Sequence, residues 1–247
     1  MKEKIKSIIS PKIFLAFCIT EILILVTLKI LQAIFPYSVI EVPPMFSAIL
    51  LNALFMLLLV IRVNGKGKDP EITGIPLAVF TTLLADCFLV LLHGLSKAEL
   101  IRFITPLTAN MIGFFIFGIV QVIYAFYLGL TKRRWIVRIG LYLVFIVSVA
   151  AAGLLTFDRF IACLSMSQLI LNLVYAWSEH RKKRTVASLI FAVGITLFFG
   201  CDLCIMLRML LPPQGLIYDV IRFMVWVFYI PSQAVLTSSY LADKANQ

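Results

Sequence analysis

Long apolar stretches, each followed by a short polar segment, repeat along this 247-residue chain. A helix that crosses a membrane needs about 20 apolar residues, because each residue adds about 1.5 Å along the helix axis. Eight stretches meet this requirement, at about residues 13–35, 44–62, 74–93, 105–130, 134–156, 159–178, 185–209 and 216–241. The pattern predicts an all-α membrane protein with eight transmembrane helices that form one polytopic domain over residues 1–247.

The fifth and sixth stretches are the least clearly separated pair. Only a tight turn near Phe157-Asp158-Arg159 divides them, so seven helices is the competing count. Composition supports an integral, multi-pass protein of the cell or inner membrane with either count, because 62% of the residues are hydrophobic and 14% are charged. A soluble domain of this length could not bury so much apolar surface. The first stretch lacks a small-residue cleavage site, so we expect a spanning helix there and not a removed signal peptide.

The basic residues alternate from one predicted connection to the next. With the N-terminus in the cytoplasm, 16 of the 22 Lys and Arg residues, Arg138 among them, fall on the inner side. Five fall on the outer side, and Lys29 lies within the first stretch. Basic loops stay in the cytoplasm, so we expect both termini there. The net charge of +10 is then explained by topology and by anionic lipids, and it does not indicate a nucleic acid partner.

A faint internal repeat accompanies these stretches. The segment "SAILLNALF", which begins at Ser47, aligns with "SQLILNLVY", which begins at Ser167, and the alignment pairs Asn52 with Asn172. Asp86 and Asp202 align at nearly the same offset. Two four-helix halves with the same orientation would form a parallel repeat. We expect these halves at about residues 13–130 and 134–241.

Two aspartates interrupt otherwise apolar sequence. Asp86 lies in "TLLADCFLVLL" and Asp202 lies in "FFGCDLCIML". A charged residue at mid-membrane costs about 2.5–3.5 kcal/mol on insertion scales, so such side chains face the bundle interior or a wet cavity. Each aspartate lies about 10 Å below the outer end of its predicted helix at 1.5 Å per residue. We therefore expect the two carboxyls at equal depth in one cavity, within about 5–10 Å of each other.

Amide and tyrosine side chains follow each aspartate at helical spacing. The fourth stretch carries Asn110, Gln121 and Tyr124 on one face, and the eighth carries Tyr229 and Gln233 with Arg222. The sixth stretch offers Gln168, Asn172 and Tyr175. Such amides commonly form hydrogen bonds between membrane helices, and this structural interpretation stays open beside a binding role.

The cysteines give no clear metal-binding pattern. All five fall within apolar stretches, which favours small core residues over disulfides or metal ligands. The pair Cys201-x-x-Cys204 has no second pair, and the two histidines are distant from it in sequence. We therefore expect neither a metal site nor a cofactor.

The aspartate segments and the aromatic-rich stretches after them resemble the YhhN-type lysoplasmalogenase family, whose members are small eight-helix membrane proteins. The stretches are "GFFIFGIVQVIYAFYLG" after the first aspartate and "WVFYIPSQAVLTSSYL" after the second. In the second half, the family has a small residue before an aspartate and then Tyr-x-x-x-Gln. Asp202, Tyr229 and Gln233 match those positions.

The first half matches the family pattern less completely. Asp86 and Tyr124 match, but the family usually carries histidine where this chain has Gln121. Ala85 also replaces the commoner glycine before the aspartate. The resemblance covers about residues 74–241, and the Gln121 difference bears on activity more than on fold.

The resemblance implies hydrolysis of the vinyl ether bond of lysoplasmalogens, which releases a fatty aldehyde and a glycerophospho-base. Protonation of the vinyl β-carbon gives an oxocarbenium ion that water attacks, and two carboxyls suit this chemistry. One aspartate would be the acid, and the other would stabilise the cation and activate water. The side chains that would orient water and the lysophospholipid headgroup are Gln121, Tyr124, Tyr229, Gln233 and Asn110.

A non-enzymatic transporter or lipid-binding protein is the alternative. Parallel repeats and intramembrane aspartates occur in transporters, whose helices often break at the binding site. Pro231 inside the last stretch and Gly200 near Asp202 are candidate break points. An assay for aldehyde release from a lysoplasmalogen separates the two functions. The sequence leaves the oligomeric state open.

Overall fold

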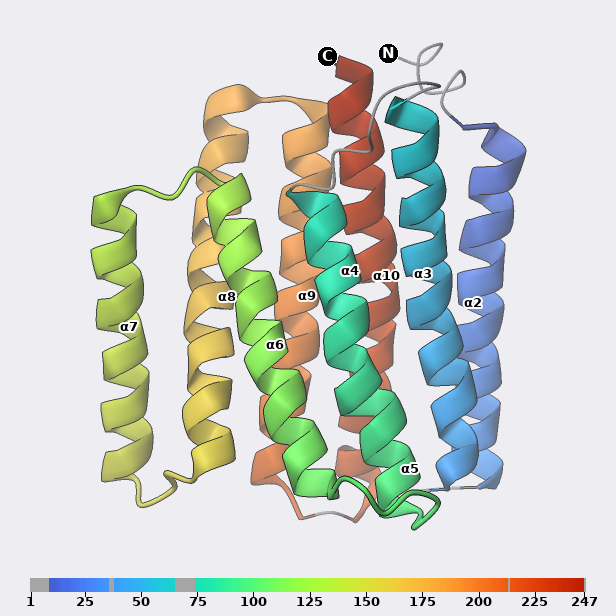
Figure 1. Cartoon of the computed structure of the whole chain (residues 1–247), viewed down its shortest axis with the longest axis vertical. Helices are drawn as coiled ribbons and strands as arrows, with labels where there is room; N and C mark the ends of the chain where they lie inside the picture. The colour runs from blue at the N-terminus through green and yellow to red at the C-terminus, as the bar shows by residue number, and fades with distance from the viewer. Residues whose placement is uncertain (1–8, 36–37, 65–73, 213, 247) are drawn as a thin grey trace. The chain divides into compact units, whose positions relative to one another are not determined.

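The computed structural model in Figure 1 describes residues 9–35, 38–64, 74–212 and 214–246. Within these ranges, eight helices are long and apolar enough to cross a membrane. They are Pro11–Ile34, Val39–Val63, Ile75–Lys97, Pro106–Tyr127, Lys132–Ala151, Arg159–Lys183, Val186–Arg208 and Leu216–Ala245. The predicted all-α, eight-helix architecture is confirmed, and the seven-helix alternative is wrong.

The elements follow the predicted order closely. Every predicted stretch contains one spanning helix, although the third span consists of three consecutive helical elements, α4, η2 and α5. The elements are α2 (Pro11–Ile34), η1 (Val39–Glu41), α3 (Val42–Asn64), α4 (Ile75–Asp86), η2 (Cys87–Leu92), α5 (His93–Lys97), α6 (Pro106–Tyr127), α7 (Lys132–Ala151), α8 (Phe157–Lys183), α9 (Val186–Leu210) and α10 (Leu216–Asn246).

Hydroxyl side chains mark where several of these helices begin. Thr105, Thr131 and Thr185 precede α6, α7 and α9, and each side-chain oxygen accepts a hydrogen bond from a backbone N–H in the first turn. Such N-caps satisfy donors that the helix itself leaves unpaired. The helix starts are therefore set locally by sequence, which explains the close match with the predicted boundaries.

The connection between α7 and α8 differs from the prediction. The expected turn near Phe157-Asp158-Arg159 is wrong, because these residues form the first turn of α8 and the connection lies at residues 152–156. Gly153 ends α7 with a φ of 68°, a left-handed conformation that glycine adopts without a steric penalty. Arg159 then donates to the backbone oxygen of Leu154 over 2.7 Å and holds the turn closed.

The chain divides into two compact units. The first unit comprises Met1–Ile72 and Ala176–Gln247, and the second comprises Thr73–Tyr175, so the division falls within α8. The units do not coincide with the predicted halves at 13–130 and 134–241. The parallel repeat therefore stays a prediction.

In the first unit, α10 packs against α9, α3 and α2. Phe17 of α2 stacks on Phe55 of α3 with ring centroids 4.1 Å apart. Gly200 allows α9 to approach α10, because a Cβ added there would lie 3.0 Å from the ring of Phe228. Arg222, in the first part of α10, forms a buried ion pair with Glu41 of η1.

In the second unit, α4 packs against α6, and three contacts fix their register. A Cβ added at Gly113 of α6 would lie 2.4 Å from the Leu89 side chain and 3.1 Å from the backbone oxygen of Ala85. A Cβ at Gly74 would lie 3.1 Å from Tyr127, and His93 Nδ1 lies 3.2 Å from the Pro106 oxygen. The two helices are therefore antiparallel and in close contact along their length (Figure 1).

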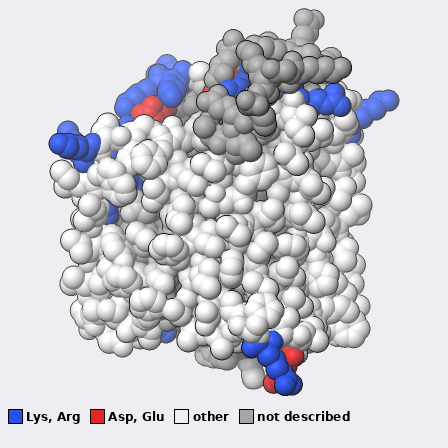
Figure 2. Space-filling model, in the orientation of Figure 1, with Lys and Arg blue, Asp and Glu red and all other residues white. Residues whose placement is uncertain are grey.

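Charged side chains gather near the helix ends on the face drawn in Figure 2, and uncharged surface lies between these ends. This distribution is typical of helices that cross a lipid bilayer. The cytoplasmic location of both ends of the chain stays a prediction. Five of the lysines counted for that prediction lie outside the described residues: Lys2, Lys4, Lys6, Lys66 and Lys68.

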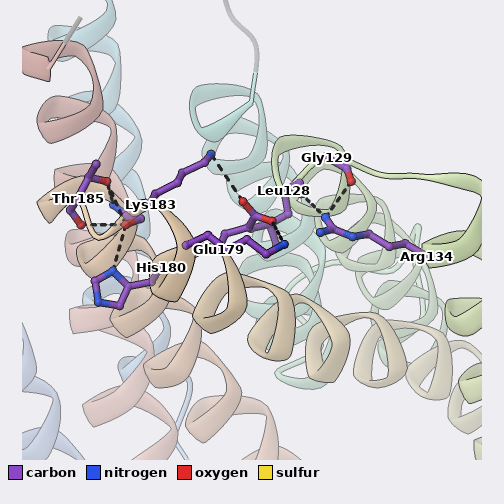
Figure 3. A network of polar contacts seen from close by, with 9 residues as sticks. Leu128, Gly129, Arg134, Glu179, His180, Lys183 and Thr185 are labelled. Carbon is purple, nitrogen blue, oxygen red and sulfur yellow. Dashed lines mark hydrogen bonds and ion pairs between the residues drawn. The ribbon is translucent and has the colours of Figure 1, made fainter.

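Polar contacts also hold the helix ends, as Figure 3 shows. In the second unit, Arg134 donates to the backbone oxygens of Leu128 and Gly129, the latter over 2.8 Å, and so links the end of α6 to the start of α7. In the first unit, His180 Nδ1 lies 3.1 Å from Ser188 Oγ and links α8 to α9. Each contact crosses a short connection between consecutive helices.

Candidate functional site

Asp86 is the last residue of α4, at the point where the helix changes its geometry. Its side chain is 4% exposed, and the next six residues, Cys87–Leu92, form a π-helical segment. Widened π-helical turns are rare and frequently occur at functional sites. This segment was not predicted from the sequence, and it lies directly beside one of the two proposed catalytic residues.

The register of α4 and α6 determines which predicted residues lie near Asp86. Gly113 faces Ala85, so Asp86 is level with the first half of α6. Asn110, which is half-buried, lies three residues before Gly113, on the side of the π-helical segment. Gln121 lies eight residues after Gly113, which corresponds to about 12 Å along the helix. Asn110 is therefore near the level of Asp86, whereas Gln121 is separated from it along the helix.

Gln121 and Tyr124 lie in the interior of the second unit. Both side chains are fully buried, on the α6 face that the helical spacing predicted. Asn172 of α8 donates to Gln121 twice, from Nδ2 to the backbone oxygen at 2.8 Å and to Oε1 at 3.0 Å. The structural interpretation of these amides is thus correct for one interhelical pair. Gln121 Nε2 has no hydrogen-bond partner among the described residues.

Arg138 of α7 extends this polar cluster. Its side chain is 1% exposed in the second turn of α7, so it is a buried helix residue, while its assignment to the inner side of the membrane stays a prediction. Its Nη1 donates to Gln168 Oε1 over 2.9 Å and its Nη2 donates to Asn172 Oδ1 over 2.8 Å. The ring of Tyr175 lies 5.4 Å from the guanidinium. The predicted face of Gln168, Asn172 and Tyr175 therefore surrounds a buried cation.

Arg138 had one usable signal in the sequence. It falls four residues inside the predicted stretch at 134–156, where a loop residue would not be expected. The amides of α8 lie 30 and 34 positions from Arg138 along the chain, so spacing alone could not pair them. We name the group Arg138, Gln168, Asn172 and Gln121 the guanidinium–amide cluster.

The first unit carries the second aspartate. Asp202 is half-buried in α9, close to the Gly200 contact with α10. Tyr229 and Gln233 of α10 are buried, one helical turn apart, and the Tyr229 ring lies 6.0 Å from that of Phe198. Gln233 Nε2, like Gln121 Nε2, has no partner within the described part of the chain. α9 and α10 continue through Gly200 and Pro231, so neither residue breaks its helix.

A further buried polar pair lies in the first unit. Asn52 of α3 donates to Glu21 Oε1 of α2 over 2.7 Å, and both side chains are 3% exposed. Glu21 Oε2 and Asn52 Oδ1 have no partner among the residues described. In the sequence, Asn52 stands out by its match with Asn172, but no pattern there pairs it with Glu21.

Asp86 and Asp202 belong to different compact units. Within their own spans, Asp86 lies 11 residues after Ile75 and Asp202 lies 16 residues after Val186, as the span limits show. A shared cavity and equal depth for the two carboxyls therefore stay predictions. The structure brings together Gln121 with Asn172, and Tyr229 with Gln233 along one face of α10.

Metal-binding and thiol chemistry add little to these clusters. The described residues contain no group of three or more His, Cys, Asp or Glu side chains that could hold a metal ion. The five cysteines are free thiols, and three of them are buried: Cys163, Cys201 and Cys204.

Comparison with known proteins identifies the family. A model of the YhhN family matches residues 47–240, a range that contains both aspartates and all of the predicted substrate-binding residues. Neither the curated proteins nor the solved structures contain a match to this chain. The family match extends over far more than half of the chain, and membership supports a lysoplasmalogenase-like function at family level. This chain therefore belongs to the YhhN family of multi-pass membrane proteins.

Proposed function

We propose that this protein hydrolyses the vinyl ether bond of a lysoplasmalogen or a related single-chain lipid, with Asp86 and Asp202 as an acid–base pair. Family membership over residues 47–240 is the observation that carries the proposal. The reaction adds one water across the vinyl ether and yields a fatty aldehyde and a glycerophospho-base with a free hydroxyl. It requires no oxidant, reductant or cofactor.

The proposed mechanism begins with proton transfer from one carboxyl to the vinyl β-carbon. The double-bond electrons form the new C–H bond, and the α-carbon becomes part of an oxocarbenium ion. Water attacks the α-carbon and loses a proton to the other carboxylate, which leaves a hemiacetal. In the collapse of the hemiacetal, the first carboxylate takes the hydroxyl proton as the C–O bond to glycerol breaks, and the other carboxyl gives its proton to the glycerol oxygen, so both carboxyls return to their starting states.

Burial of Asp86 supports the role of acid. The side chain is 4% exposed at the end of α4. Burial from water disfavours the charged form of a carboxyl, so a deeply buried carboxyl suits the role of proton donor. The neighbouring π-helical segment, Cys87–Leu92, widens the helix at the same level. We therefore assign protonation of the β-carbon to Asp86.

Partial exposure of Asp202 supports the complementary role. Its side chain is half-buried, and the aromatic rings of Phe198, Trp226 and Tyr229 lie along the same α9–α10 contact. An ionised carboxylate can accept a proton from water and can stabilise a nearby cation. The electron-rich faces of aromatic rings also favour a cation. We therefore assign activation of water and stabilisation of the oxocarbenium ion to Asp202.

Measurement of aldehyde release from a lysoplasmalogen by the purified full-length protein tests the proposal. Asp86→Asn and Asp202→Asn each remove a carboxyl and keep the side-chain shape, and each should reduce turnover by about 10²–10⁴-fold. Asp219→Asn is the matched control, because Asp219 is exposed at the start of α10. This control should retain wild-type turnover.

Two results would overturn the proposal. Full turnover by both aspartate variants would exclude the carboxylate mechanism. Absence of aldehyde release by the wild-type protein, together with binding of single-chain lipids, would instead favour the transporter or lipid-binding alternative.

A further inference from the structure

The buried guanidinium of Arg138 has no carboxylate partner among the described residues. Its acceptors are the neutral oxygens of Gln168 and Asn172, and its Nε has no partner within the described part of the chain. Amide oxygens satisfy hydrogen bonds but do not neutralise the charge. A buried ion without an opposite charge is unfavourable, so an anion nearby would be stabilised.

The hydrogen bonds of Arg138 also fix the orientation of Gln121. A guanidinium can only donate, so Asn172 must present Oδ1 to Arg138. A backbone oxygen can only accept, so Asn172 must present Nδ2 to the Gln121 backbone, and Gln121 must in turn present Oε1 to that Nδ2. Gln121 Nε2 is therefore directed away from Asn172. It is a buried donor without an acceptor among the described residues.

The charge of Arg138 affects Gln121 Nε2, which lies at the other end of this series of hydrogen bonds. A hydrogen bond from a charged donor polarises Asn172, which then polarises the Gln121 amide in the same sense, and such chains strengthen cooperatively. Gln121 Nε2 consequently suits an anionic acceptor. It suits poorly the vinyl ether oxygen, which gains positive charge when the β-carbon is protonated. Among the groups of a lysoplasmalogen, the phosphate is the anionic acceptor.

The separation of Asp86 and Gln121 along the helix axis fits a phosphate as the acceptor of the Gln121 hydrogen bond. Gln121 lies about 10–12 Å from the level of Asp86, by the register of Gly113 against Ala85. Seven bonds separate the vinyl β-carbon from the phosphorus atom of a lysoplasmalogen, and they span about 9 Å when extended at ordinary bond lengths. A lipid with its β-carbon beside Asp86 would therefore place a phosphate oxygen near the level of Gln121.

We propose that the guanidinium–amide cluster is the phosphate-recognition subsite for a single-chain glycerophospholipid. This inference rests on the proposed function for the position of the reacting bond. Gln121 Nε2 donates to a phosphate oxygen. Arg138 and Asn172 are positioning residues, because they orient and polarise the Gln121 amide. Phosphate thus determines which single-chain lipids bind, and the alkyl chain extends from Asp86 toward the opposite end of the unit.

Asn172→Asp is the most direct test. The substitution keeps the oxygen that faces Arg138 but replaces the donor to Gln121 with a second oxygen. The Gln121 amide is then expected to turn, with Nε2 toward α8 and Oε1 toward the lipid phosphate. The variant should bind lysophosphatidylethanolamine with an acyl chain about 10–100-fold more weakly, because one hydrogen bond to an anion is lost and one repulsion is gained. Binding of a monoacylglycerol with the same chain should be unchanged.

Matched controls separate this effect from folding and from surface charge. Arg133→Gln removes a basic residue from the exposed surface of the same helix, α7, and should leave both affinities unchanged. Thermal unfolding of Asn172→Asp in detergent should resemble that of the wild type, because the variant retains an acceptor for Arg138. Arg138→Lys should show an intermediate loss of phospholipid affinity, since lysine keeps the charge but not the planar pair of donors.

The source of the phosphate is tested by competition. Inorganic phosphate and glycerophosphoethanolamine, at concentrations that saturate ordinary phosphate sites, should compete weakly with the lipid because they lack the alkyl chain. Strong competition by inorganic phosphate would identify a free-anion site and overturn the lipid assignment. Equal wild-type affinity for phospholipid and monoacylglycerol, or unchanged phospholipid affinity in Asn172→Asp, would overturn the subsite itself.

The binding assay uses an ester lipid, so it does not depend on vinyl ether hydrolysis. If phospholipid binding depends on Asn172 but no aldehyde is released, the subsite stands and the proposed hydrolysis fails. If aldehyde is released with equal efficiency from vinyl ether lipids with and without phosphate, hydrolysis stands and the subsite fails.

Discussion

The α2–α3 pair of the first unit and the α7–α8 pair of the second unit bury ionisable side chains of opposite charge beside aligned asparagines. Glu21 bonds with Asn52 in the first pair, and Arg138 bonds with Asn172 in the second. The two asparagines are the residues that the internal repeat aligns. Similar positions in sequence thus carry opposite chemistry in the two units.

The two charged groups differ in how well they are satisfied. Arg138 donates to three oxygen atoms of Gln168 and Asn172, and an aromatic ring lies near it. Glu21 accepts one hydrogen bond, and its Oε2 has no partner among the described residues. Neutral amides and backbone oxygens can therefore surround a guanidinium, whereas one amide cannot satisfy a carboxylate. We conclude that the α7–α8 pair supplies several hydrogen-bond partners to its buried ionisable side chain, whereas the α2–α3 pair supplies one.

In the first unit, a second buried carboxylate, that of Glu41, is neutralised by an ion pair. Glu41 is 3% exposed between α2 and α3, and it accepts from Arg222 of α10 and from Gln32 of α2. This ion pair joins three helices, and Lys29 lies 4.6 Å from the ring of Phe223 close by. The comparison between the units therefore concerns three buried ionisable side chains with different partners: an ion pair for Glu41, neutral oxygens for Arg138 and a single hydrogen bond for Glu21.

Arg222→Met should have the largest effect on stability. It leaves the Glu41 carboxylate buried without its cation, and breaking such a pair typically costs about 3–5 kcal/mol. Thermal unfolding in detergent measures the loss. The double variant with Glu41→Gln should recover most of the stability, since no charge then remains buried. Equal destabilisation of the single and double variants would contradict the proposed importance of this ion pair.

Arg138→Met should destabilise the protein less than Arg222→Met. It leaves neutral oxygens of Gln168 and Asn172 without their donor, at about 1–3 kcal/mol for a buried group. Arg133→Met, an exposed change on the same helix, is the control and should be nearly neutral. A loss larger than that of Arg222→Met would show that neutral solvation contributes more than charge pairing here.

Gly113→Ala should have a moderate effect on stability and a local effect on catalysis. The added Cβ would meet the Leu89 side chain and the Ala85 oxygen, and such overpacking costs about 1–3 kcal/mol. The α4–α6 contact beside Asp86 would widen, so aldehyde release should also fall. Gly140→Ala is a matched control, because no atom lies within 4 Å of a Cβ at that position in α7.

Glu21→Gln should have the smallest effect. The amide keeps an oxygen for Asn52 Nδ2 and adds a donor close to Asn52 Oδ1, which lacks one. The free energy of unfolding should change by no more than about 1 kcal/mol, and a small gain is the expected sign. A large loss, measured by thermal unfolding, would show that the Glu21 charge itself is required in the α2–α3 pair.

Much of the fold could be predicted from local sequence. The third expected helix began at residue 74 and α4 begins at Ile75, and the fourth began at 105 and α6 begins at Pro106. Apolar length and threonine caps determine these limits, and both are local properties. The turn before α8 was misplaced, because Phe157 and Arg159 fit a turn as well as a helix start in composition alone.

The candidate site was less predictable because it depends on partners distant in sequence. Burial of Gln121 and Tyr124 followed from helical spacing, since one face of α6 is polar and small. Burial of Arg138 depends on the amides of α8. In the sequence, Arg138 follows other basic residues closely and cannot be distinguished from a residue of a predicted cytoplasmic connection. The π-helical segment after Asp86 contacts α6, and no local pattern in the sequence marks it.

The π-helical segment also has a consequence for how this helix can change in length. A π-helical hydrogen bond spans five residues where an α-helical bond spans four, so the turn holds a residue that a regular helix would not need. Deletion of one residue within Cys87–Leu92 would allow the helix to close as a regular α-helix. The residues on either side would keep their faces. Elsewhere in α4 the same deletion would rotate every following side chain by about 100°. Single-residue insertions and deletions among relatives should therefore concentrate directly after the aspartate.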